Sequence, residues 1–103
     1  MKIIFSDYAL MQLEQIYYFL QNQNVNAAIH IHNFILDEIE KLRNFPQMAA
    51  IEPELLSFSH IYRSLVVRKR YKVVYYLEKD IIHISAIFDC RQNPKKLRDV
   101  IYQ

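Results

Sequence analysis

Arg63, Lys72, Tyr76 and His83 are side chains capable of acid–base or electrostatic catalysis, and they fall in three neighbouring segments rich in β-forming residues. Side chains alternate between the two faces of a strand, so Arg63, Lys72 and Tyr76 can share one open face, with His83 beside them. A tyrosine and a histidine next to two cations can do acid–base work. The alternative, which we favour, is that Tyr76 and His83 are half-buried sheet residues covered by a C-terminal helix.

Three short strands must position these side chains. The segments Ile61–Val67, Tyr71–Leu77 and Ile81–Phe88 are rich in Val, Ile, Tyr and Phe. Their connections, Arg68-Lys69-Arg70 and Glu78-Lys79-Asp80, are short and fully charged. A parallel return needs a much longer crossover, so the three strands are predicted to form an antiparallel meander.

The first half of the chain is predicted to be mainly helical. Apolar residues recur there at spacings of three and four, and polar caps or a proline bound each run. The expected elements outside the meander are a strand at Lys2–Ser6, helices from Asp7 to about Asn22 and from Val25 to Asn44, a long connection at Gln47–His60, and a short helix at Lys95–Tyr102.

The two predicted helices carry more apolar residues than a contact with one sheet requires. The residues outside the sheet-facing stripes are Leu10, Tyr17, Phe19, Ile29 and Leu36. An exposed apolar patch of this kind is typical of a surface that binds a partner.

Composition narrows the possible functions. The length of 103 residues predicts a single domain, residues 1–103. The chain has no glycine, which excludes the phosphate-binding loops that need one, so no nucleotide cofactor is expected. The single cysteine, Cys90, and the lack of a signal or membrane segment favour a cytoplasmic protein with no membrane partner. His30 and His32 point in different directions on a helix, and no metal site is expected.

Charge is divided unevenly along the chain. Residues 1–61 hold three basic and seven acidic side chains, whereas residues 62–103 hold ten basic and four acidic ones. This asymmetry indicates an acidic or polyanionic partner for the second half.

An ordered set of motifs in the second half resembles a known family. Tyr-Arg-x-Leu-Val-Val at 62–67 precedes Tyr-Lys-Val-Val-Tyr-Tyr at 71–76, an Ile-rich strand and Phe-Asp-x-Arg-Gln-Asn-Pro at 88–94. Together with the preceding strand and helices, this order is similar to the RelE/ParE superfamily of toxins from type II toxin–antitoxin pairs. The resemblance implies an α+β fold of strand-helix-helix-strand-strand-strand order with a short C-terminal helix, in which a helical hairpin packs on an antiparallel sheet.

The resemblance leaves two activities open. In the RelE branch, a ribosome-dependent, metal-independent nuclease of messenger RNA, the corresponding basic residues are Arg63, Lys72 and Arg91, with Tyr76 or His83 as acid–base candidates. That branch also has a Tyr or His in the C-terminal segment, which 93–96 lacks. In the ParE branch, the toxin inhibits DNA gyrase by binding and needs no catalytic residues.

The missing acid–base residue and the Arg-Gln-Asn-Pro tail favour the ParE branch, and an inactive or divergent nucleic-acid-binding member is a further alternative. The resemblance implies a bacterial cytoplasmic toxin, with no cofactor, that forms a hetero-oligomer with a small antitoxin. The expected target-binding residues are Arg63, Lys72, Arg91, Lys95, Lys96 and Arg98. The expected antitoxin-binding residues are Leu10, Tyr17, Phe19, Ile29 and Leu36.

Overall fold

The predicted elements are present, and three short elements lie between the second helix and the meander. The structure is a computed structural model that describes residues 1–101. Its elements are β1 (Lys2–Phe5), α1 (Asp7–Gln21), α2 (Val25–Glu40), the 3-10 turn η1 (Lys41–Arg43), β2 (Ala50–Ile51), the 3-10 turn η2 (Pro53–Leu55), β3 (Arg63–Val67), β4 (Tyr71–Glu78), β5 (Ile81–Asp89) and α3 (Lys96–Ile101).

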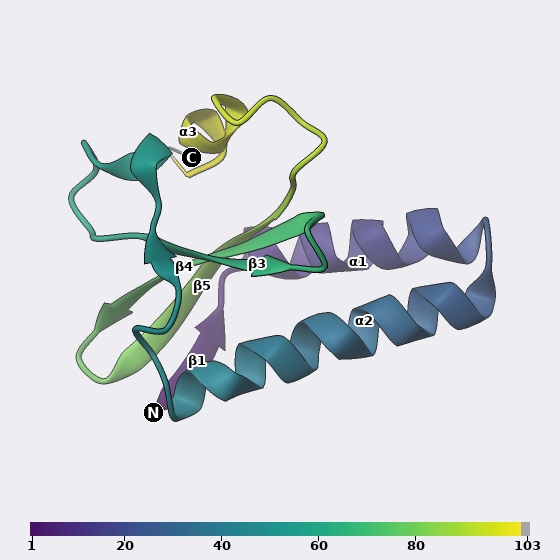
Figure 1. Cartoon of the computed structure of the whole chain (residues 1–103), viewed down its shortest axis with the longest axis horizontal. Helices are drawn as coiled ribbons and strands as arrows, with labels where there is room; N and C mark the ends of the chain where they lie inside the picture. The colour runs from purple at the N-terminus through teal and green to yellow at the C-terminus, as the bar shows by residue number, and fades with distance from the viewer. Residues whose placement is uncertain (102–103) are drawn as a thin grey trace.

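Two polar side chains fix where the helices begin. Ser6 caps α1, since its hydroxyl accepts a hydrogen bond from the Ala9 N–H at 3.0 Å. Asn24 caps α2 through the Ala27 N–H at 3.1 Å. The short polar break between the helices makes them an antiparallel hairpin, seen side by side in Figure 1. None of the helices within residues 1–101 is long and apolar enough to cross a membrane.

The five strands form one sheet in the order β1-β5-β4-β3-β2. The meander β3–β4–β5 is antiparallel as predicted. β1, however, pairs with β5 in parallel, so the sheet is mixed rather than wholly antiparallel. The segment of chain between β1 and the meander contains the helical hairpin. This segment is long enough for the chain to return and place a later strand parallel to β1. The two-residue strand β2 adds to the other edge beside β3 and is too short to show a sequence period.

The sheet is buried on both faces, so the molecule has three layers. The helical hairpin covers one face, where Ile35 and Ile39 pack against Val73 and Ile84. On the opposite face lies α3 (Figure 1), and Leu97 packs there with a second apolar cluster. Of the N-terminal apolar run, Ile4 is 38% exposed, because it lies on an edge strand and points away from the hairpin.

A register shift at Val74/Tyr75 divides β5 between the two faces. Ile82 and Ile84 pack on the helical side, but beyond the irregularity Ala86 and Phe88 pack on the α3 side. A bulge of this kind changes the phase of the alternation by one residue. Alternation alone therefore cannot assign the faces of β5.

Both tight turns of the meander adopt a left-handed backbone without glycine. Arg68 and Lys69 have φ of 53° and 57°, and Lys79 and Asp80 have φ of 53° and 62°. Two successive positive φ values match the twist of a β-hairpin, although residues with a Cβ atom adopt them at a free-energy cost.

Candidate functional site

Arg63 and Lys72 lie on opposite faces of the sheet, so the expectation that they share one is wrong. The three-residue turn pairs Val67 with Tyr71, and this register places Arg63 opposite Tyr75 and Lys72 opposite Val66. Odd-numbered residues of both strands therefore face the helical side. There Arg63 Nη1 donates to the Ala49 carbonyl at 2.8 Å, which ties β3 to the segment before β2.

Lys72 makes an ion pair with a buried carboxylate on the α3 side. Glu52 is 1% exposed and accepts hydrogen bonds from Lys72 Nζ at 2.8 Å, Ser64 Oγ at 2.8 Å and the Glu54 N–H at 2.9 Å. Burial raises the pKa of Glu52, but these three hydrogen bonds and the charge of Lys72 together hold the pKa below its ordinary value. In this arrangement Lys72 anchors the η2 segment to the sheet.

Tyr76 and His83 do lie side by side, in a stack of three rings. Their ring centroids are 4.6 Å apart at an interplanar angle of 9°, and His60 stacks at 3.8 Å on Tyr76. Tyr76 packs against the α3-side cluster, which includes Val100. Burial raises the pKa of Tyr76, and the charge of Glu78 raises it further, so the phenol is protonated at neutral pH. This placement of Tyr76 agrees with the half-buried alternative rather than with an open acid–base site.

Arg91 lies in the loop after β5 and is held by Asp89. Its Nη2 donates to Asp89 Oδ2 at 2.8 Å, and its guanidinium lies 5.6 Å from the centroid of the Phe19 ring. Burial raises the pKa of Asp89, but the hydrogen bonds and charge of Arg91, with the charge of Arg70, lower it below its ordinary value. The nearby Asp89 carboxylate in turn raises the pKa of Arg91.

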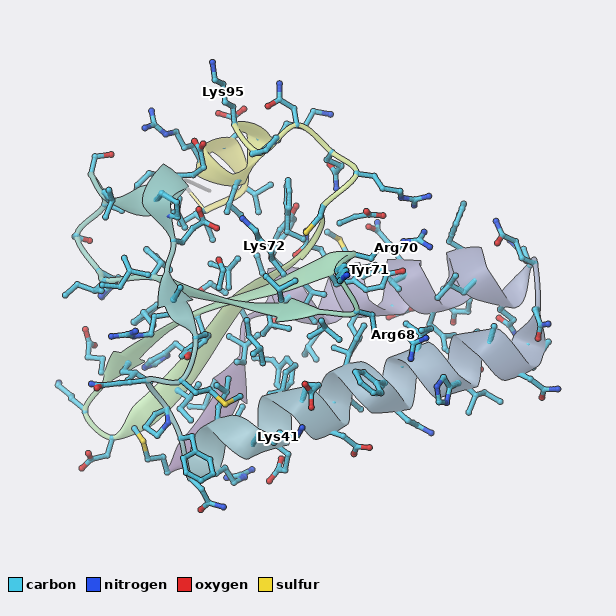
Figure 2. The ribbon with its side chains drawn as sticks, in the orientation of Figure 1. Lys41, Arg68, Arg70, Tyr71, Lys72 and Lys95 are labelled. Carbon is cyan, nitrogen blue, oxygen red and sulfur yellow. The ribbon has the colours of Figure 1, made fainter. Side chains whose placement is uncertain are left out.

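The six expected target-binding cations do not form one patch, and Lys72 is paired with Glu52 on the α3 side of the sheet. Arg63 lies on the helical side and Arg91 in the loop after β5. Lys95, Lys96 and Arg98 lie at α3, where Lys95 extends away from the sheet in Figure 2. Arg98 Nε donates to the Glu54 carbonyl at 3.0 Å, which fixes α3 against η2.

A groove of about 640 Å³ lies between α1 and α2. We call it the helix groove; its lining residues are Leu10, Leu13, Glu14, Tyr17, Tyr18, Ile29, His32 and Asn33. Leu10 and Ile29 are 49% and 44% exposed at its walls. Tyr17 contacts His32 edge to face, with ring centroids 5.6 Å apart. Two antiparallel helices thus present apolar residues along an open channel.

The structure brings together three of the five residues expected to bind an antitoxin. Leu10, Tyr17 and Ile29 line the helix groove. Leu36 lies seven residues after Ile29, on the same side of α2, but it packs against the core. Phe19 is nine residues after Leu10, which places it on the opposite side of α1. The sequence pattern missed Tyr18 and His32, because the facing of two helices depends on their packing.

Phe19 instead lines a smaller cavity of about 240 Å³ between α1 and the ends of the meander. Arg70 and Arg91 contribute the two cationic groups of this site, which we call the Arg70–Arg91 cavity. The sequence identifies Arg70 only as one of three charged residues in a strand connection. Its place beside α1 depends on tertiary packing, which brings it into one cavity with Gln15 and Phe19.

Comparison with known proteins agrees with this architecture. A sequence model of the ParE toxin of type II toxin–antitoxin systems, parDE, matches residues 3–94. Among solved structures, a chain described as the chromosomal ParDE TA system from P. aeruginosa superposes with a TM-score of 0.71 at 16% identity, over 86% of this chain and 95% of that chain. Among curated protein sequences, none matches significantly. The predicted superfamily and its α+β architecture are thus confirmed, and the chain belongs to the ParE toxin family of type II toxin–antitoxin systems.

Proposed function

We propose that this ParE-family protein is a cytoplasmic toxin that inhibits DNA gyrase by binding it and that a small antitoxin neutralises it. The observation that favours binding over RNA cleavage is the separation of the three cations of the nuclease pattern. Arg63 and Lys72 point to opposite sides of the sheet, and Lys72 is paired with buried Glu52. Metal-independent cleavage of RNA needs cations and acid–base groups converging on one phosphate.

The helix groove supports neutralisation by a helical segment of the antitoxin. An amphipathic helix bound in a groove places apolar anchors at spacings of three and four residues. Leu10, Leu13 and Tyr17 offer matching apolar contacts along one side of the groove, and Ile29 offers one on the other side. The antitoxin is therefore proposed to bury these side chains between its own helix and the hairpin.

A paired assay with the purified protein tests the proposed target. We expect loss of DNA supercoiling by gyrase when the protein is added, with ribosome-bound messenger RNA left intact. Cleavage of message in a purified translation system without gyrase inhibition would instead assign the nuclease activity. If neither target is affected, the chain is an inactive or divergent member of its family.

The same assay separates the candidate residues. If the protein inhibits gyrase, removing the positive charges in the loop and helix from Arg91 to Arg98 is expected to weaken that inhibition, because this region is exposed. The double variant Arg63→Ala, Lys72→Ala tests the nuclease pattern, and its loss of message cleavage would identify those cations as the RNA site. Circular dichroism of each variant distinguishes loss of activity from loss of the fold.

A further inference from the structure

The Arg70–Arg91 cavity has a buried donor without an acceptor. Within residues 1–101, Arg70 Nε is the buried side-chain polar atom that has no hydrogen-bond partner. Buried polar groups in native proteins are nearly always paired, and an unpaired one calls for an explanation such as a bound water or ion. Arg70 is also one of the residues that line the cavity, so a group bound there lies beside its side chain.

The backbone of Arg70 is held by two hydrogen bonds, and its side chain packs beside an aromatic ring. The backbone N–H of Arg70 donates to the Val67 carbonyl at 3.2 Å, and its backbone carbonyl accepts from the Cys90 N–H at 2.6 Å. The guanidinium carbon lies 5.3 Å from the centroid of the Tyr71 ring. Figure 2 shows Arg70 on the side of α1, whereas Arg68 in the same turn lies toward α2.

Arg91 supplies a second guanidinium to the same cavity. Asp89 engages its Nε and Nη2, which orients the side chain beside the Phe19 ring. The lining residues comprise two arginines and one aspartate, so the cavity keeps a net positive charge. Gln15 and Gln92 add neutral amide groups at its wall. Two guanidinium groups beside the Phe19 ring favour an anionic group that is attached to an apolar one.

We propose that the cavity binds the carboxylate of an acidic side chain from a partner protein. A planar carboxylate matches the fork of an arginine, and the cavity volume of about 240 Å³ suits a single side chain. Nucleic acid is the weaker alternative, because its backbone is bound by a row of cations and this cavity has two, one of which is shared with Asp89.

This inference deepens the proposed function, since an antitoxin is the protein partner proposed above. Phe19 and Leu10 lie on opposite sides of α1, so a partner that fills both the helix groove and this cavity must pass around that helix. The carboxylate would then be a charged anchor separate from the apolar contacts of the groove.

Nuclear magnetic resonance of the arginine Nε–Hε groups tests the site directly. The ¹⁵N-labelled protein is titrated at constant ionic strength with acetyl-Leu-Glu-Leu-amide and with acetyl-Leu-Gln-Leu-amide. We expect the Glu peptide to shift the Arg70 and Arg91 signals saturably, and the Gln peptide to bind about tenfold or more weakly, because a hydrogen bond to a charged group is lost. Arg70→Gln and Arg70→Lys are both expected to weaken binding of the Glu peptide, whereas Arg68→Gln, a matched change in the same turn, is expected to leave it unchanged.

Three results would overturn the proposal. Equal shifts with both peptides would show that the carboxylate is not recognised. Equal loss in Arg68→Gln and Arg70→Gln would show only general charge attraction. Stronger binding of a DNA hexamer at the same signals would assign the cavity to a phosphate. None of these results bears on gyrase inhibition or on the helix groove, so this inference can fail while the proposed function stands.

Discussion

At the scale of single residues, a buried carboxylate determines what Lys72 can do. Glu52 accepts three hydrogen bonds and is 1% exposed, so its charge depends on Lys72 for compensation. Removing one partner of such a pair leaves the other charge uncompensated in a poorly solvated place. We interpret this pair as the attachment of the β2–η2 segment to the sheet.

Replacing Glu52 with Gln is expected to lower the free energy of unfolding at pH 7 by about 2–3 kcal/mol. The folded pKa of Glu52 lies below its ordinary value of 4.5. Its ionised form therefore stabilises the fold above that value, and the contribution is lost as the pH falls toward the lowered pKa. The difference between wild type and Glu52→Gln should thus shrink in acid, as measured by urea unfolding over a pH series.

Glu54→Gln is the matched control for this experiment. Glu54 belongs to the same segment, but its carboxylate is partly exposed and lies 3.9 Å from Arg98 Nε. Replacing Glu54 with Gln is expected to lower the free energy of unfolding by at most about 1 kcal/mol. Asp89, whose pKa is also lowered, is present in both the wild type and Glu52→Gln. Its contribution to the pH dependence of unfolding therefore cancels when these two proteins are compared. A difference between wild type and Glu52→Gln that does not change with pH would contradict the assigned role of the ion pair.

At the scale of elements, the helix groove depends on two helices that each present part of its wall. Ile29→Asp is expected to weaken antitoxin binding by about tenfold or more, since a buried anchor in a helix groove becomes a desolvated charge. Val25→Asp is the matched control, because Val25 is 51% exposed on the same helix and does not line the groove. Isothermal titration with the antitoxin gives both affinities, and equal affinities for the two variants would exclude the groove as its site.

The elements themselves were largely predictable from the sequence, but their faces and edges were not. Polar residues cap the helices as expected, at Ser6 and Asn24, and charged turns separate the strands of the meander. The partner of Lys72 could not be found, because Glu52 lies in a segment with no period and reaches the sheet only through tertiary packing. The face of the sheet on which Arg63 lies was predicted wrongly. The geometry of the turn sets the register of the two strands, and the register decides which of their residues share a face.

At the scale of the whole molecule, charge is segregated between the acidic first part of the chain and the basic second part. If an antitoxin with an acidic segment binds this protein, raising the salt concentration should slow association much more than it speeds dissociation. Salt screens long-range attraction between charges, whereas apolar contacts in the helix groove persist. Stopped-flow mixing over a salt series measures both rates. An association rate that is indifferent to salt would place the antitoxin outside the basic surfaces.

The parallel pairing of β1 with β5 also has a consequence for the order in which the molecule forms. The hydrogen bond from Ser6 Oγ to the Ser85 carbonyl joins residues 79 positions apart, and β5 lies between β1 and β4 in the sheet. During synthesis the residues of the helical hairpin are made long before those of β5. Until β5 is made, the apolar face of the hairpin has no complete sheet to pack against. Contacts this distant in sequence form slowly, because a long loop must close first. The newly made chain therefore contains both helical segments before the strand that joins β1 to the meander, and a partner or chaperone able to cover their apolar residues would meet it in that state.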